Sequence, residues 1–107
     1  MVAAKPPEPV ILPPDVERYV ARHFRPEDRK DALELLAAAV RADGSAPDAR
    51  LYRCAAVASG GSLDRLLYEV ESLARDYRDV IVEGEYEPTG KKLVRVRNLS
   101  DPIPDDL

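Results

Sequence analysis

Residues 62–87 read SLDRLLYEVESLARDYRDVIVEGEYE and carry the strongest helical pattern of this 107-residue chain. Apolar residues recur along the stretch at intervals of three and four, which is the spacing of one face of an α-helix. They are Leu63, Leu66, Leu67, Val70, Leu73, Ala74, Tyr77, Val80, Ile81 and Gly84. The pattern predicts one long helix that must stop at Pro88. The β-branched run at 80–82 also permits a short strand, but the helical period continues on both sides of it and favours the helix.

Three shorter helices are predicted upstream of this stretch. Their expected ranges are 15–24, 26–41 and 47–58. Asp15 is a suitable N-cap residue for the first helix, and Ser45 with Asp48 resembles a capping box for the third. With the long helix these predict an all-α fold of four helices, packed as a small antiparallel bundle or an orthogonal array.

Two segments flank the helical domain, which is predicted over residues 15–88. The proline-rich residues 1–14 contain five prolines, which exclude helix and predict an extended strap over the body or, alternatively, a docking peptide. Within the following segment, 89–107, residues 91–97 are rich in basic side chains, and valine alternates with arginine over 94–97. This alternation predicts a basic extended segment that lies on the helices or pairs between subunits. Residues 98–107 are predicted to be a disordered acidic tail.

The composition excludes several classes of protein. The chain carries 16 basic and 20 acidic residues, for a net charge of −4. It has one cysteine, Cys54, and one histidine, His23, which excludes an internal disulfide, a cysteine-based zinc site and a His-rich metal site. No apolar run approaches the ~20 residues of a membrane span, and the N-terminus does not read as a signal peptide. We therefore expect a soluble cytoplasmic protein with Cys54 packed in its core.

Three short motifs lie within residues 50–88: SGGSLDRL at 59–66, DYRDVI at 76–81 and EY at 85–86. Together they resemble a group of small bacterial proteins of unknown function that share an SGG-x-L segment followed by DYRD and EY. No activity is known for that group, so the resemblance carries no functional residue over to this chain. It implies a bacterial, cytoplasmic protein.

Residues 62–87 also have a charge imbalance, with three basic and eight acidic side chains. Four of the acidic residues fall near one face of the predicted helix: Glu69, Asp76, Asp79 and Glu83. Like charges at this spacing repel, so the face is solvated, covered by the basic segment 91–97, or bound to a basic partner. Asp76, Asp79 and Glu83 also offer the oxygen ligands that Mg²⁺ and Ca²⁺ prefer, and Asp76 with Asp79 has the residue types of an acid–base pair.

From this charge pattern we expect a non-enzymatic protein that binds an unknown protein partner through its acidic helix face. Tyr68 and Tyr86 are the predicted apolar anchors, and Asp76, Asp79 and Glu83 are the predicted charge contacts. No catalytic residue, metal ligand or cofactor is assigned. A homodimer is an alternative, because the apolar face of the long helix exceeds what three short helices cover.

Two other functions stay open at this point. The second and third predicted helices, joined by a short turn, have the scale of a DNA-binding helix-turn-helix. The basic residues that would contact nucleic acid are Arg50, Arg53, Lys91, Lys92, Arg95 and Arg97. The net negative charge of the chain argues against such a ligand. The remaining alternative is a small metal-dependent hydrolase built around Asp76, Asp79 and Glu83.

Overall fold

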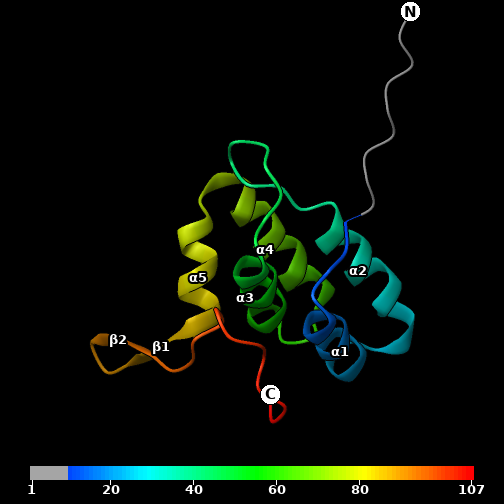
Figure 1. The fold of residues 1–107 in the computed structure, drawn as a ribbon. Helices are drawn as coiled ribbons and strands as arrows, with labels where there is room; N and C mark the ends of the chain where they lie inside the picture. Colours follow the sequence, from blue (N-terminus) through cyan, green and yellow to red (C-terminus); the bar gives the residue numbers. More distant parts are fainter. Residues whose placement is uncertain (1–9) are drawn as a thin grey trace, which may run out of the picture.

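The computed structural model describes residues 10–107, which form a mostly helical domain with a small C-terminal β-hairpin (Figure 1). The prediction of a helical fold is confirmed, but these residues form five α-helices rather than four. The elements are α1 (Pro14–His23), the 3₁₀ turn η1 (Pro26–Asp28), α2 (Arg29–Ala37), α3 (Ala49–Ser59), α4 (Leu63–Arg75), α5 (Tyr77–Glu85), β1 (Tyr86–Thr89) and β2 (Lys92–Arg95). Within this part of the chain no helix is both long and apolar enough to cross a membrane.

The prediction of one long helix over 62–87 is wrong, because the chain breaks at Asp76. This residue is extended, with φ −158° and ψ 106°. Its N–H donates to the Ser72 carbonyl at 2.7 Å and closes α4, while its carboxylate accepts from the Arg78 N–H at 3.0 Å and caps α5. A single non-helical residue leaves the apolar spacing almost unchanged. The periodicity therefore detects both helices but not the break between them.

α3 occupies the centre of the helical body, where it packs against α1, α4 and α5 (Figure 1). The helix α5 approaches α3 unusually closely at Gly84. A Cβ atom at Gly84 would lie 2.7 Å from the Cα of Cys54 and 2.9 Å from the Cys54 carbonyl oxygen. Cys54 and Ala55 are fully buried in this contact region of α3, which confirms the predicted core position of Cys54. Small residues on both helices thus allow the two backbones to meet.

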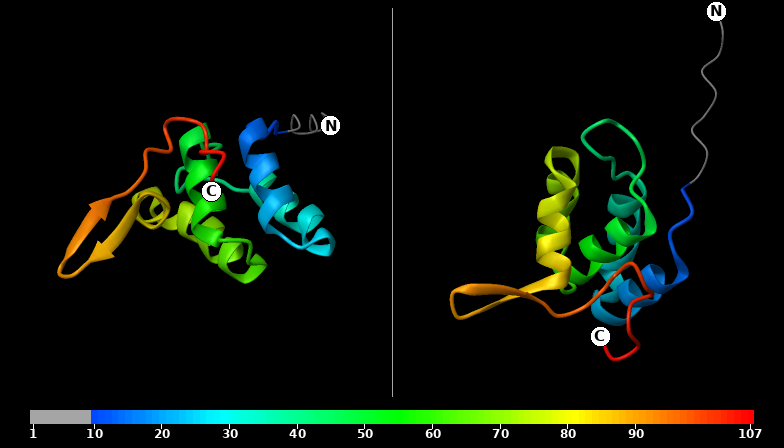
Figure 2. Two further views of the ribbon diagram at one scale, coloured as in Figure 1. Left: turned by 90° about the horizontal axis from the view of Figure 1, so that it is seen from below. Right: turned by 60° about the vertical axis from the view of Figure 1, so that its left-hand side comes forward.

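The basic segment is half of a hairpin rather than a strap on the helices. β2 pairs antiparallel with β1, with Tyr86 opposite Arg95 and Thr89 opposite Lys92. Gly90 has φ +64°, which suits the first position of a two-residue type II′ turn. The helix therefore ends at Glu85 instead of continuing to Pro88. Figures 1 and 2 show that the hairpin projects away from the helices.

Both flanking segments contribute side chains to the core. Leu12, Leu99 and Ile103 are buried among the helices, so the prediction of a disordered tail over 98–107 is wrong. Asp15 is not the N-cap of α1, a position that Pro13 takes. Its carboxylate is instead buried and accepts a hydrogen bond from the Ile103 N–H at 3.0 Å. The strap predicted for 1–14 lies outside the described residues up to position 9.

The region between α2 and α3 also differs from the prediction. α2 ends at Ala37, so Val40 is exposed rather than part of an apolar helix face. Residues 38–48 connect the two helices, and the side chain of Asp48, not Ser45, caps α3 by accepting from the Leu51 N–H at 2.9 Å. A connection of this length is not the short turn that a helix-turn-helix requires.

Candidate functional site

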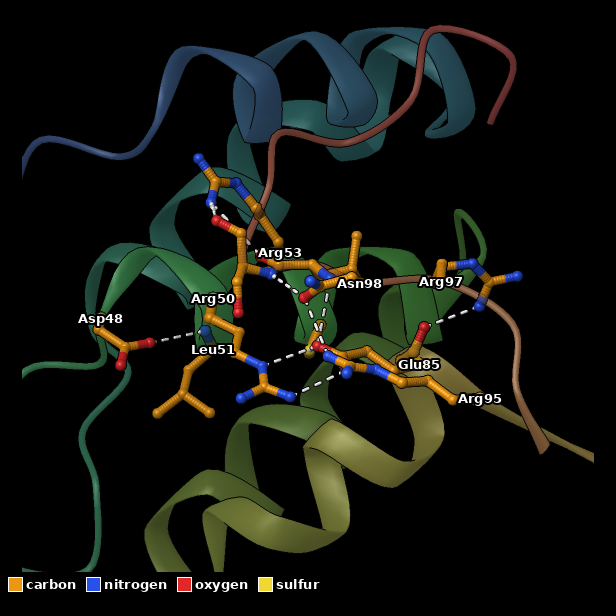
Figure 3. Close-up of polar contacts among 12 residues, drawn as sticks. Asp48, Arg50, Leu51, Arg53, Glu85, Arg95, Arg97 and Asn98 are labelled. Carbon is orange, nitrogen blue, oxygen red and sulfur yellow. Dashed lines mark hydrogen bonds and ion pairs between the residues drawn. The ribbon is translucent and has the colours of Figure 1, made fainter. Parts of the chain in front are cut away.

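The densest polar cluster of the described chain surrounds Glu85, the last residue of α5 (Figure 3). Its carboxylate is fully buried. Arg50 of α3 binds both carboxylate oxygens, with Nε 2.8 Å from Oε2 and Nη2 2.9 Å from Oε1. Arg95 of β2 donates from Nε to Oε1 at 3.0 Å, and the Leu99 N–H donates to Oε2 at 3.2 Å. One carboxylate therefore joins α3, α5, the hairpin and the C-terminal segment.

The electrostatics of this cluster favour a fixed charge rather than a reactive group. Burial by itself would raise the pKa of Glu85, but the hydrogen bonds from Arg50, Arg95 and Leu99 outweigh burial and lower it to about 2. The Cys54 thiol lies 3.6 Å from Glu85 Oε2. Burial, together with the neighbouring carboxylate, raises the pKa of Cys54 to about 12, so the sulfur is held as a neutral thiol and not as a nucleophilic thiolate.

Four of the six basic residues predicted for nucleic-acid binding form ion pairs or hydrogen bonds with other residues of the chain. Arg50 and Arg95 bind Glu85, as described above. Arg53 binds the Asp15 carboxylate, with Nε 2.8 Å from Oδ2, and the Ser100 carbonyl at 3.1 Å. Arg97 donates to the Gly84 carbonyl at 2.7 Å and to Glu87 at 3.2 Å. Arg50 and Arg53 therefore do not form an outward-facing recognition surface. The other two, Lys91 and Lys92, are exposed at the hairpin turn.

The structure does not assemble the acidic helix face as predicted. Asp76 caps α5 and holds the Arg78 guanidinium at 2.9 Å, while Glu83 forms an ion pair with Arg65 of α4. Glu69 is fully buried, and only Asp79 is an exposed acidic residue of the four. Of the predicted anchors, Tyr68 is exposed beneath the Arg65 guanidinium and Tyr86 is half-buried.

The sequence pattern predicts Glu69 at the surface, but its side chain is fully buried. Among residues 10–107 neither of its carboxylate oxygens has a hydrogen-bond partner, and Arg65 Nε lies 3.5 Å from Oε1. Burial raises the pKa of Glu69 to about 8, and the nearby carboxyl groups of Glu83 and Asp79 add to the shift while Arg65 opposes it. The environment of Glu69 therefore favours its protonated form, at the place where α4 meets α5.

Metal binding at Asp76, Asp79 and Glu83 has no geometric support. Across the described residues the structure brings no three carboxylate, imidazole or thiol side chains together in an arrangement that would hold an ion. Two of the three carboxylates are instead bound to arginines of the same chain.

A different surface offers an open apolar hollow, which we call the α2–α4 groove. Its volume is about 420 Å³. The floor consists of Leu35 and Ala38 from the α2 side and Leu63 and Leu67 from α4, and the rim carries carboxylates. The acidic rim residues are Asp31, Glu34 and Asp64. Sequence reasoning missed the groove because it forms between two helices that are distant in the chain. The one available signal was that the apolar face of each helix is wider than a single packing contact needs.

Comparisons of the chain with protein-family models, with curated proteins and with solved structures found no match. The resemblance to small bacterial proteins therefore stays a prediction.

Proposed function

We propose that this chain is a non-enzymatic protein-interaction module and that its docking surface is the α2–α4 groove. The single observation that carries the proposal is the groove itself, an apolar hollow of about 420 Å³ that opens to solvent between two helices. The sequence-based expectation of a protein partner is kept, and the docking surface moves from the acidic helix face to the groove.

The groove has the chemistry of an interface rather than of a catalytic pocket. Leu67 projects from α4 with 45% of its surface exposed, and Leu35 and Leu63 are only partly buried beside it. Exposed leucines that gather in one hollow gain free energy when a partner covers them, at about 25 cal/mol per Å² of apolar surface removed from water. The polar residues at the rim are carboxylates, which add charge selectivity to this apolar attraction.

The remaining polar clusters support a structural role, because their charged groups are satisfied within the chain. Glu85 and Asp15 bind arginines that would otherwise be available to a ligand. A lone, buried thiol at Cys54 fits a reducing compartment, and we place the module in the bacterial cytoplasm on that ground and on the resemblance.

Site-specific cross-linking tests the proposal. A photoreactive amino acid is placed at position 67 in the groove, at position 79 on the acidic helix face, or at position 93 on the hairpin, and each protein is irradiated in bacterial lysate. We expect a discrete protein adduct from position 67 that disappears when Leu35 is replaced by Asp, with folding of that variant checked by circular dichroism. Adducts from position 79 alone would return the docking surface to the acidic helix face and contradict the groove.

A further inference from the structure

We infer that the occupant of the α2–α4 groove is an amphipathic helix whose apolar stripe is flanked by lysine or arginine. This inference rests on the proposed function and adds the shape and the charge of the partner. It is based on the two helical walls of the groove, on the carboxylates at its rim, and on the ion pairs that these carboxylates do or do not form within residues 10–107.

The walls of the groove are themselves helices, which favours a helical occupant. α2 supplies Leu35 and α4 supplies Leu63 and Leu67, one turn apart on the same face. A third helix packs into the furrow between two helices by placing its own apolar ridge there. Helix-in-groove recognition of this kind uses anchors at i, i+3, i+4 and i+7. A hollow of about 420 Å³ admits a few such side chains.

The rim selects the charge of the occupant. Asp31 on α2 and Asp64 on α4 lie on opposite walls, and both are exposed. Within residues 10–107 neither of them forms an ion pair, and Glu34 meets only the exposed Lys30, at 3.9 Å. A helix in the groove would therefore have carboxylates along both sides of its apolar stripe. Lysine or arginine at the flanking positions matches them, while glutamate there would be repelled.

The same rim argues against a second copy of this chain as the occupant. Packing groove against groove would bring the acidic rims of both copies together, and within residues 10–107 the one cation paired with a rim residue is Lys30, 3.9 Å from Glu34. Of the exposed lysines within residues 10–107, Lys91 and Lys92 lie on the projecting hairpin, and Lys30 lies on α2 beside the rim residue Glu34. The hairpin also exposes Leu93 and Val94 beside its lysines, but on a β-strand, whose alternating side chains lack the i, i+3, i+4 spacing of helix-in-groove anchors. A heterologous basic helix satisfies both the apolar floor and the acidic rim.

The test uses three synthetic peptides of equal length, titrated into the ¹⁵N-labelled full chain at low salt. The first has leucines at helical spacing with lysine elsewhere. The second has glutamate in place of each lysine, and the third is the lysine peptide interrupted by a central proline. We expect the lysine peptide to shift the amide signals of Leu35, Ala38, Leu63 and Leu67 and to bind about tenfold or more tightly than the other two.

Matched variants separate the groove from general attraction between opposite charges. Asp64→Asn and Asp79→Asn remove the same charge, but only Asp64 lies on the rim. We expect Asp64→Asn to weaken the lysine peptide several-fold and Asp79→Asn to leave its affinity unchanged. Leu67→Ala should weaken it about tenfold, whereas Leu93→Ala, at the exposed position on β2, should not.

The outcomes distinguish this inference from the proposed function. If the glutamate or proline peptide shifts the groove signals with equal affinity, the basic helix is wrong while the groove remains a docking surface. If shifts from the lysine peptide map to Asp76 and Asp79, or if Asp79→Asn weakens binding as much as Asp64→Asn, both statements are overturned. Concentration-dependent self-association abolished by Leu67→Asp would make a second copy the occupant and overturn the basic helix.

Discussion

The Arg50 guanidinium binds the Glu85 carboxylate in a two-pronged contact, with Nε 2.8 Å from Oε2 and Nη2 2.9 Å from Oε1 (Figure 3). The two residues are 35 positions apart in the chain. Their contact fixes the end of α5 against α3, and Arg95 and Leu99 bind the same carboxylate from the hairpin side. A planar guanidinium suits this bidentate geometry, which a lysine cannot reproduce.

Replacing Glu85 with Gln should destabilise the fold by about 2–3 kcal/mol, because two arginines lose their anion while remaining partly shielded from water. Both arginines keep some contact with solvent, which moderates the loss. Urea unfolding followed by circular dichroism measures it. The control is Glu87→Gln at an exposed surface pair, which should cost less than about 1 kcal/mol. Equal losses in the two variants would mean that the cluster does not join the elements as described.

From the pKa of the Glu85 carboxylate we predict how the stability of the fold changes at acidic pH. The pKa of Glu85 is about 2 in the folded chain against an ordinary 4.5, so the unfolded chain binds more protons between these values. Stability contributed by Glu85 is therefore present above pH 4.5 and is lost as the pH falls toward about 2. The pKa of Asp15 is lowered too, by the Ile103 N–H and Arg53 against the opposing effect of burial. Unfolding free energies of Glu85→Gln across this range should fall less steeply than those of the native chain, without becoming flat.

For Glu69 we expect the opposite trend, a loss of stability as the pH rises. Its pKa in the folded chain is about 8, above the ordinary 4.5, so the folded state retains a proton that the unfolded state releases. The stability linked to this proton is present below pH 4.5 and is lost as the pH rises toward about 8. Glu69→Gln keeps the shape without the titration, so its unfolding free energy should change less over this range and exceed that of the native chain at about pH 9. Glu71→Gln, at an exposed position on α4, is the control and should follow the native curve.

Gly84→Ala tests the contact between α3 and α5. Alanine is favoured over glycine in a helix by about 1 kcal/mol, but here its Cβ would meet the Cα and carbonyl oxygen of Cys54 at 2.7 and 2.9 Å. The overlap should outweigh the helix preference and give a net loss of about 1–3 kcal/mol in thermal or urea unfolding. Since the nearest atoms belong to the backbone, adding Cys54→Ala should not restore stability. Recovery in the double variant would show that the side chain, and not the backbone, sets the spacing.

Leu99→Ala tests whether the C-terminal segment belongs to the core. Leu99 is fully buried among the helices, so truncating it should cost about 2–5 kcal/mol, as for other buried leucines. Leu93, with 60% of its surface exposed on β2, is the matched control, and its replacement by Ala should change stability by less than about 0.5 kcal/mol. A neutral Leu99→Ala would support the tail that the sequence predicted.

The helical class, an extended segment over 91–97 and the core position of Cys54 could all be predicted from the sequence, because they follow from the spacing of apolar residues along the chain; residues 92–95 of that segment form β2. Helix boundaries were less accurate where one residue decided them. Asp76 both ends α4 and begins α5, and the apolar period passes through it with little change. Asp48 caps α3 in place of Ser45 for a similarly local reason, since several acidic and hydroxyl residues nearby are suitable caps.

Which charges are available at the surface depends on how the helices pack against one another. Glutamate is usually a surface residue, yet Glu69 and Glu85 are both buried. Arg50 forms an ion pair with Glu85, and Arg53 forms one with Asp15. A charge pattern along the chain gives no information on partners that lie 35 or more positions away. The α2–α4 groove is likewise a property of two helices brought side by side. The burial of a side chain and the partner of a charge both depend on which residues lie nearby in space. They are therefore set only when the helices pack together.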